Sequence, residues 1–486
     1  MRRTSHIAII ISIVAVGARL IAIDHPFTDT WSWRQSDVAA IARNYFEGGF
    51  HFAHPQIDWA GDQPGYVGTE FPILPFVAAL CYKCLGVHEW VGRIQALIFF
   101  AISLPFFFLL VREIAGEIVA TWALIFYSFA PVGIMASRCF MPDIPSLALS
   151  LIGLYFFARW LTTERPTAFV LAALAISLSI LIKLPSAIIG APLACICFQR
   201  FRFSAFQRLH LWLFAVIVLL PSAIWYWYAY QISLTFYPHH FFGAGGFKIM
   251  PLSWYWKIVK EIPILTLTPI VFILGAIGLF LARRISGARS FYWWLIAMIL
   301  FVIVVGYGNR HPWYRLPLVP IAALFAGVAS EWIGAKIASH TARVIASVLL
   351  LALVGFSSIA ALRVFYEPKN SPLRDAGLML NEITPEDSLI AAADNGDPTV
   401  LYYGHRKGWH FLEKDGIYYG DPDGSAPAIA NLAELRSKGA KYLVFTSNTA
   451  WWLDLYPEFR EYVHANSALI AATSEFSIYR LDPITK

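Results

Sequence analysis

Long apolar runs, separated by short polar connections, occupy the chain from Met1 to about Tyr366. Their lengths, and the scarcity of charge inside them, are typical of helices that cross a bilayer. The runs lie near residues 1–23, 91–111, 117–135, 143–161, 167–183, 185–199, 209–228, 262–282, 291–307, 314–334 and 342–362. The pattern predicts a polytopic α-helical membrane protein with about eleven transmembrane helices.

A further apolar segment, residues 71–87, would reverse the orientation of every later span if it crossed the membrane. It is short and contains Pro72, Pro75 and Lys83. If it does not cross, the basic residues of the later connections fall on the side of the N-terminus, as expected of cytoplasmic loops. These residues are Arg112, Arg159, Arg165, Arg200, Arg202, Arg208, Arg283, Arg284, Arg289 and Lys336. We therefore expect an interfacial or re-entrant helix at 71–87 and a cytoplasmic N-terminus.

The region after the last apolar run has the mixed pattern of a folded polar domain. Residues 371–383 have helical spacing, 387–394 predict a strand, 432–446 a helix and then a strand, and 475–482 a last strand. Eleven spans that start inside finish outside, so this region is expected on the extracytoplasmic face. The predicted division is a membrane module, 1–366, with outer loops at 24–70 and 231–261, and an extracytoplasmic α/β domain, 367–486.

The composition supports a membrane protein and excludes an ordinary soluble one. Hydrophobic residues make up 58% of the chain and charged residues only 14%, whereas about a quarter of a typical soluble domain is charged. The net charge of +6 reports membrane topology first. We expect membrane lipid around the chain and no nucleic-acid partner, because no acidic or basic tail is present.

The first outer loop carries the first candidate for chemistry. Its stretch WSWRQSDVAAIARNYF predicts an amphipathic helix along the membrane surface. Arg34 and Asp37 are three residues apart and share a face, and Asp29 precedes them. The simpler alternative is an interfacial helix whose Arg and Asp only pair. Trp31 and Trp33 either anchor the helix at the headgroups or line a substrate pocket.

The second candidate lies where polar residues meet the ends of spans. Arg138 and Asp143 flank a short outer connection, and Lys183 stands just before Pro185 at the end of another span. Ionisable groups at membrane level are costly and by default indicate function. The alternative is that they extend towards lipid headgroups.

The order of these motifs resembles a known family. Glu70-Phe71-Pro72, then Arg93, Asp143, Lys183 and RHPWYRLPLVP follow one another as in the polyprenyl-phosphate-sugar glycosyltransferases of the GT-C fold. The nearest members are the protein O-mannosyltransferases and the lipid A aminoarabinose transferases. The resemblance covers about Asp24 to Pro320. It implies an enzyme of the bacterial inner membrane that passes a sugar from a polyprenyl monophosphate to an acceptor at the periplasmic face, with inversion.

The resemblance also implies roles for particular residues. The family's catalytic base is acidic and lies at the start of the first loop helix, which favours Asp37, with Asp29 as the competing candidate. Arg34 and Asp37 stand in exchanged places relative to the aminoarabinose transferases. Asp143 matches a second family Asp that orients the site or the acceptor. Lys183 matches a Lys near the carrier phosphate, which Arg34 is also expected to contact.

Phe71 replaces a family Lys that contacts the phosphate, so another cation has to supply that charge. The candidates are Arg93, Arg138 and Arg310.

A structural divalent metal is the one cofactor that the resemblance suggests. Glu70, His239 or His240, and Tyr314 fall where the aminoarabinose transferases hold such a metal, and the residue types suit zinc. The alternative is a hydrogen-bonded pair of histidines in a folded loop. Glu70 and Tyr314 are also expected in the substrate pocket.

Two other functions remain open. A transporter or flippase of lipid-linked saccharide would also need buried cations, but its usual inverted repeats and broken mid-membrane helices are not evident. A catalytically inactive assembly partner is the second, because of the Arg34 and Asp37 exchange. The glycosyltransferase hypothesis requires Asp37, Asp143 and Lys183 to converge on one pocket, and it leaves open the sugar, the oligomeric state and whether the acceptor is a lipid, glycan or protein.

Overall fold

The computed structural model describes residues 2–242 and 246–483, so residues 243–245 of the predicted 231–261 loop lie outside the described part. The chain divides into two compact units. The membrane unit comprises residues 1–23, 93–225 and 243–364, and the α/β unit comprises residues 24–92, 226–242 and 365–486. The α/β unit thus contains the first outer loop as well as the C-terminal region. Each unit is described separately below.

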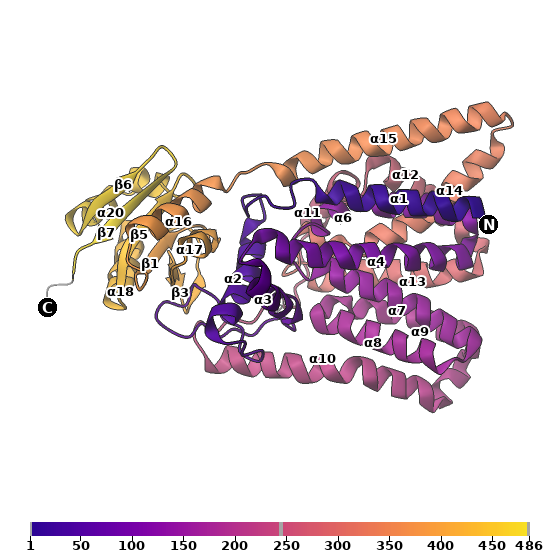
Figure 1. Ribbon diagram of the computed structural model, residues 1–486, viewed down its shortest axis with the longest axis horizontal. Helices are drawn as coiled ribbons and strands as arrows, with labels where there is room; N and C mark the ends of the chain where they lie inside the picture. Colours follow the sequence, from indigo (N-terminus) through magenta and orange to yellow (C-terminus); the bar gives the residue numbers. More distant parts are fainter. Residues whose placement is uncertain (1, 243–245, 484–486) are drawn as a thin grey trace. The chain divides into compact units, whose positions relative to one another are not determined.

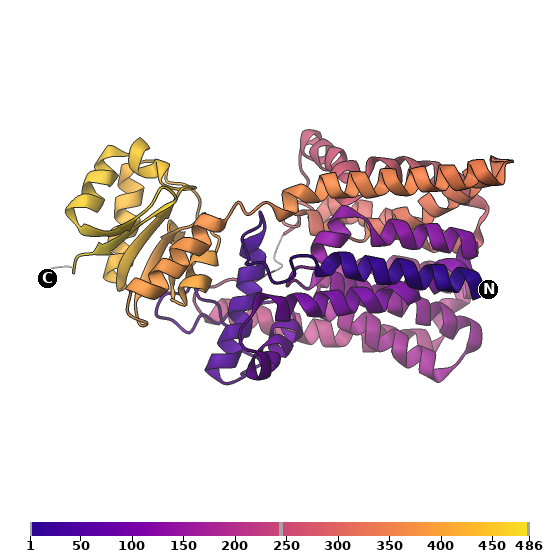
Figure 2. The same ribbon diagram turned by 45° about the horizontal axis from the view of Figure 1, so that its top comes forward.

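The apolar runs form helices, which confirms a polytopic helical membrane protein. They are α1 (Arg2–Leu20), α4 (Glu89–Ala115), α5 (Glu117–Ser128), α6 (Pro131–Ala136), α7 (Asp143–Thr163), α8 (Pro166–Ile182), α9 (Gly190–Phe201), α10 (Leu209–Thr235), α11 (Leu252–Glu261), α12 (Pro269–Leu281), α13 (Arg289–Val305), α14 (Leu318–Lys336) and α15 (His340–Tyr366). Figures 1 and 2 show many of them side by side.

Not every predicted span is a long helix. Within the described residues, seven helices are long and apolar enough to cross a bilayer, and a pair bent by 110°, Leu252–Thr266 with Pro269–Arg284, makes up to eight. Three other predicted spans are shorter apolar helices, at His6–Leu20, Glu117–Ser128 and Pro166–Ile182. Each of the eleven predicted runs therefore coincides with a helix, but the length criterion supports fewer of them as complete spans.

Helices α7 and α8 form a close antiparallel pair. A Cβ on Gly153 of α7 would lie 2.3 Å from Cγ1 of Ile176 on α8, so the two backbones approach more closely than a larger residue permits. Pro185 cannot donate a backbone hydrogen bond and clashes with the carbonyl four residues earlier, which explains why α8 ends at Ile182. The antiparallel pairing places the start of α7 and the end of α8 at the same end of the pair.

The C-terminal region forms the predicted α/β domain. Its five-stranded sheet has the order β2-β1-β5-β7-β6, with β1 parallel to β2 and β5, and β7 antiparallel to β5 and β6. The strands are β1 (Leu389–Ala393), β2 (Gly408–His410), β5 (Ala440–Thr446), β6 (Ser467–Ala472) and β7 (Phe476–Leu481), beside a small hairpin of β3 (Glu413–Lys414) and β4 (Ile417–Tyr418). The helices are α16 (Ser371–Ile383), α17 (Thr399–Gly404), α18 (Ser425–Ser437), α19 (Trp451–Leu455) and α20 (Pro457–Ala465).

Helices cover both faces of this sheet (Figure 1). Side chains alternate along β1 and β5, so Ala391 and Leu443 pack with α18 and α20, whereas Ile390 and Val444 pack with α16 and α17. The hydrophobic core on the side of α16 and α17 also includes Ile41 of α2 (Ser32–Gly48). The amphipathic loop helix is therefore buried against the C-terminal domain and is part of the same hydrophobic core.

The apolar segment at 71–87 forms α3 (Ile73–Leu85), which has 13 residues and belongs to the α/β unit. A helix of that length is too short to cross a bilayer. It packs against α2.

Substitution at Gly278 tests the close approach of α12 and α14. A Cβ at this position would lie 1.8 Å from the carbonyl oxygen of Phe325, so Gly278→Val should lower the free energy of unfolding by about 1–3 kcal/mol. The matched control is Gly355→Ala in α15, where a Cβ meets nothing within 4 Å. Thermal unfolding in detergent should show a lower midpoint only for Gly278→Val, and equal midpoints would contradict this packing.

Candidate functional site

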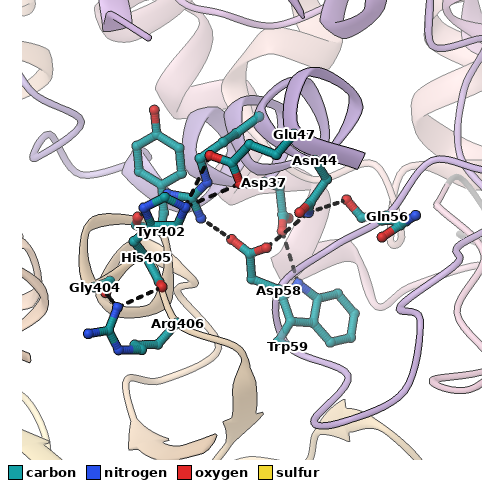
Figure 3. A network of polar contacts seen from close by, with 11 residues as sticks. Asp37, Asn44, Glu47, Gln56, Asp58, Trp59, Tyr402, Gly404, His405 and Arg406 are labelled. Atoms are coloured by element: carbon teal, nitrogen blue, oxygen red, sulfur yellow. Dashed lines mark hydrogen bonds and ion pairs between the residues drawn. The ribbon is translucent and has the colours of Figure 1, made fainter. Parts of the chain in front are cut away.

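Asp37 is a buried carboxylate on α2, held by a hydrogen bond to an indole. Asp37 is only 4% exposed. Trp59 Nε1 donates to Asp37 Oδ1 at 3.0 Å, and Figure 3 shows the two side chains pointing toward one another. Burial raises the pKa of Asp37 to about 6, although the charge of Arg34 and the Trp59 hydrogen bond both lower it. Asp37 is therefore ionised near neutral pH but is a stronger base than an exposed aspartate.

Arg34, one turn before Asp37, is compensated by another carboxylate. Its Nη2 atom donates to Glu70 Oε1 at 2.8 Å and Oε2 at 2.9 Å, and the Thr69 hydroxyl also donates to Glu70. The simple alternative, in which Arg34 and Asp37 only pair with each other, does not describe this arrangement. Arg34 instead lies between two acidic groups of the α/β unit.

Asp29, the competing base, lies in the turn that precedes α2. Its Oδ1 accepts from the backbone N–H of Trp31 and its Oδ2 from the side chain of Gln35, both at 2.9 Å. These contacts join the turn before α2 to the first turns of the helix. Trp31 packs on Phe365 with ring centroids 5.0 Å apart, and Trp33 is half-buried. Trp31 thus has a packing partner within the α/β unit, and Trp33 is partly covered by protein.

The C-terminal domain adds buried acidic and basic groups that sequence reasoning missed. His410 Nδ1 is 2.9 Å from both carboxylate oxygens of Asp394. Asp397 accepts from Ser32, Asn370 and Thr399, and so connects the starts of α2, α16 and α17. Burial raises the pKa of Asp397 to about 7. The available signal was the sequence DNGDP directly after a buried strand, since polar residues at that edge of a sheet are often functional.

Arg43, on the opposite end of α2, is also paired across the α/β unit. Its Nη2 atom lies 2.7 Å from Asp58 Oδ2, and its Nη1 donates to the carbonyl of Tyr402 on α17. Asn44 donates to the other oxygen of Asp58 (Figure 3). Asp58 precedes Trp59, so this contact also fixes the loop that holds the indole near Asp37.

In the membrane unit, Asp143 and Lys183 form a buried ion pair. Lys183 Nζ is 3.2 Å from Asp143 Oδ1, and their side chains are only 5% and 4% exposed. Nζ also lies 4.5 Å from the centre of the Tyr314 ring. Within the described residues, Asp143 Oδ2 has no hydrogen-bond partner. The three side chains line one small cavity together with Ser150, which brings together three predicted site residues.

The arginines predicted to replace the family Lys donate to backbone carbonyls or are exposed. Arg93 donates to the carbonyl of Ile23, and Arg138 donates to the carbonyl of Ala22. Both arginines therefore bind the backbone just after α1. Arg310 is exposed. The buried arginine of that loop is Arg315, missed by the sequence analysis, whose Nη1 and Nη2 both lie 2.9 Å from Glu261 Oε2.

Arg315 lies at the edge of a large apolar cavity in the membrane unit. The cavity has a volume of about 610 Å³. Apart from Arg315 and the Tyr255 hydroxyl, its walls are almost wholly aliphatic and aromatic carbon from α11 to α14. Such a cavity suits a hydrocarbon chain.

The residues proposed for a metal do not fit one as they are arranged. Glu70 accepts two hydrogen bonds from Arg34, and the Arg34 charge opposes a cation at the same carboxylate. His239 contacts the carbonyl of Ser233, and the His240 ring packs edge-on against Phe242 and Trp59. No group of three or more His, Cys, Asp or Glu side chains able to hold a metal occurs in the described ranges.

The predicted site residues thus fall into two sets. Asp37, Arg34, Glu70 and Asp29 belong to the α/β unit, whereas Asp143, Lys183 and Tyr314 belong to the membrane unit. Each set is held together internally by the contacts given above. The convergence of Asp37 with Asp143 and Lys183 stays a prediction.

The Asp143–Lys183 pair makes a stability prediction. Lys183→Met leaves a buried carboxylate without its cation and should cost about 3–5 kcal/mol, and Asp143→Asn should have a similar effect. The double variant removes both charges and should recover much of that loss. Thermal unfolding of the three proteins in detergent measures the coupling. If the two single losses simply add in the double variant, the ion pair contributes nothing.

Comparisons with known proteins were made by sequence and by structure. Residues 62–227 match the family model described as dolichyl-phosphate-mannose-protein mannosyltransferase. A search of curated proteins finds no match. The fold is similar to that of ArnT from Cupriavidus metallidurans bound to undecaprenyl phosphate, with a TM-score of 0.67, 16% identity and 97% of each chain covered.

It is also similar to the Archaeoglobus fulgidus oligosaccharyltransferase in its apo form, with a TM-score of 0.64, 15% identity and coverage of 99% of this chain and 75% of that one. The Archaeoglobus fulgidus enzyme AglB in complex with an inhibitory peptide and a dolichol-phosphate gives a TM-score of 0.61 at 14% identity, covering 99% and 74%. The resemblance inferred from the motifs is therefore confirmed: this chain is a polytopic membrane protein with the GT-C fold, and its residues 62–227 match the mannosyltransferase family model.

Proposed function

We propose that this chain is an inverting glycosyltransferase of the bacterial inner membrane. It would move a monosaccharide from a polyprenyl-phosphate carrier to a hydroxyl of a lipid, glycan or protein at the periplasmic face, with the N-terminus in the cytoplasm. The observation that carries the proposal is the buried Asp37 carboxylate, on the first loop helix of a GT-C fold. Solved proteins of this fold bind undecaprenyl phosphate or dolichol-phosphate, which supports the choice of carrier.

Asp37 is assigned as the general base. It takes the proton of the acceptor hydroxyl while that oxygen forms a bond to the anomeric carbon. The bond from the anomeric carbon to the phosphate oxygen breaks, and its electron pair leaves with the polyprenyl phosphate. The leaving group gains negative charge, which a cation stabilises. Arg34 and Lys183 are the proposed contacts to this phosphate, and Asp143 is the proposed orienting residue.

The large apolar cavity supports a lipid-linked donor. Its carbon-lined walls suit an isoprenoid chain, and Arg315, the cation among the lining residues, is compensated by Glu261. A water-soluble nucleotide-sugar donor would not need such a cavity. The cavity therefore favours a polyprenyl carrier over a soluble one.

Substitution of the base tests the assignment. Asp37→Asn should lower the turnover of purified protein about 10²–10⁴-fold, because the amide cannot accept the proton. Asp29→Asn keeps an oxygen that can accept from the backbone N–H of Trp31, and it should retain most turnover. The assay uses a panel of labelled polyprenyl-phosphate sugars and measures release of the polyprenyl phosphate.

Other results would support the alternatives. Loss of turnover in Asp29→Asn but not in Asp37→Asn would make Asp29 the base. Carrier movement across vesicles without sugar release would indicate a transporter, and no turnover with any donor would favour an inactive assembly partner.

The pH dependence gives a second test of Asp37. Because its pKa is raised to about 6, the base is ionised above that pH and protonated below it. Turnover at low substrate should therefore fall about tenfold for each pH unit below about 6 and level off above it. A profile measured from pH 5 to pH 8 shows this limb. Turnover that stays constant through pH 6 would contradict Asp37 as the base.

A further inference from the structure

We propose that the C-terminal domain is part of the catalytic apparatus, because its Asp394–His410 pair positions Asp37 and keeps it ionised. This inference rests on the proposed function, since it assigns a role to residues beside the proposed base. His410 is a positioning residue, and it acts on Asp37 through Trp59, which contacts both residues. The domain would then do more than cover the site or present the acceptor.

The topology of the sheet brings His410 and Asp394 to one edge. Strands β1 and β2 are parallel, with Ala392 opposite His410, and Asp394 follows the end of β1. Carboxyl ends of parallel strands form the usual ligand-binding edge of an α/β sheet. This edge is directed at α2 through the cluster described above, in which Asp397 contacts Ser32.

The imidazole is oriented by its carboxylate. His410 Nδ1 lies 2.9 Å from both oxygens of Asp394, and the two residues are 4% and 1% exposed. The contact assigns the proton on Nδ1 to this hydrogen bond, as in carboxylate–histidine pairs that fix the tautomer and orientation of a ring. A cationic imidazole is favoured here because acidic groups surround it.

Trp59 connects the imidazole to the base. Its indole lies against the His410 ring, with centroids 5.1 Å apart and planes inclined by 38°, and it donates to Asp37 from Nε1. His240 contacts the same indole with centroids 5.5 Å apart. The indole is thus enclosed between two imidazoles and held to the carboxylate.

Backbone hydrogen bonds fix the Trp59 loop to β2 independently of these side chains. Gly408 donates to the carbonyl of Asp58 at 3.0 Å, and Gly61 donates to the carbonyl of Gly408. A Cβ on Gly61 would lie 2.0 Å from the Trp409 ring, so no larger residue fits this approach. The loop that carries Trp59 is therefore docked on the strand that carries His410, and a shift of one moves the other.

The charges around the cluster account for an ionised Asp37. Arg34 and His410 favour its carboxylate form, and Asp58 opposes it. Burial lowers the pKa of His410, but Asp394, Asp37 and Asp397 outweigh burial, so the pKa of His410 is raised. His240 stays neutral because burial and Arg34 lower its pKa to about 4. Loss of the imidazolium would leave Arg34 as the main cation that opposes protonation of Asp37.

The test compares two imidazoles of the same domain. His410→Gln keeps a donor for Asp394 but removes the charge, and it should move the acid limb of the pH profile from about 6 to about 7. Turnover should fall about fivefold at pH 6 and remain nearly unchanged at pH 8. His405→Gln is the control, because His405 pairs with Glu47 on the surface and is half-exposed. It should leave the limb in place.

Asp394→Asn is the second variant and keeps the inference testable if His410→Gln does not fold. Without the Asp394 carboxylate, the imidazole loses the main negative charge that raises its pKa, so less of it is protonated. The acid limb should therefore move in the same direction. A loss of turnover that is equal at every pH, or an unmoved limb in a folded variant, would overturn the inference. Failure of the proposed function is recognised separately, because the unsubstituted protein would then release no polyprenyl phosphate from any donor. Turnover retained in Asp37→Asn would show that the base is another residue.

Discussion

Ionisable groups inside this protein are stable only when an opposite charge or several donors compensate them, since burial removes the hydration of a charge. The structure obeys this constraint in both units. Asp143 is paired with Lys183 and Arg315 with Glu261 in the membrane unit. Arg34 is paired with Glu70 in the α/β unit. Because buried pairs of this kind cost more to build than hydrophobic contacts, the buried groups in the membrane unit are candidates for a functional role.

The same constraint explains why the α/β unit draws on three parts of the chain. Helix α2 carries more buried polar residues than a lone surface helix could bury, among them Ser32, Arg34 and Asp37. Each needs a partner, and the partners come from the loop after α2 and from the C-terminal domain, as Trp59 and Asp397 illustrate. The first outer loop and the C-terminal domain therefore belong to one unit, because Ser32 and Arg43 of the loop have their partners in the C-terminal domain.

The sequence predicted elements that depend on neighbouring residues along the chain. It did not predict contacts between residues that are far apart in the sequence. Residues 371–383 form α16 as expected, because apolar spacing marks a helix without knowledge of its neighbours. The pairing of Asp143 with Lys183 follows only from the packing of α7 on α8. His410 was missed because a histidine in a short strand has no local signal, and its role depends on Asp394 and Trp59 from other segments. Arg315 was missed because the pattern does not show which arginine of the loop is buried.

The exchange of Arg34 and Asp37 that the resemblance to the aminoarabinose transferases implies is compatible with the proposed activity. Residues three apart on a helix lie on the same face about 5–6 Å apart, so the exchange moves the carboxylate by less than one helical turn. An inactive relative would have no need to keep both charges buried. Here each retains a dedicated partner, Glu70 for Arg34 and Trp59 for Asp37. The base is defined by its reach to the acceptor hydroxyl and by its pKa, and neither property requires a particular position in the sequence of α2.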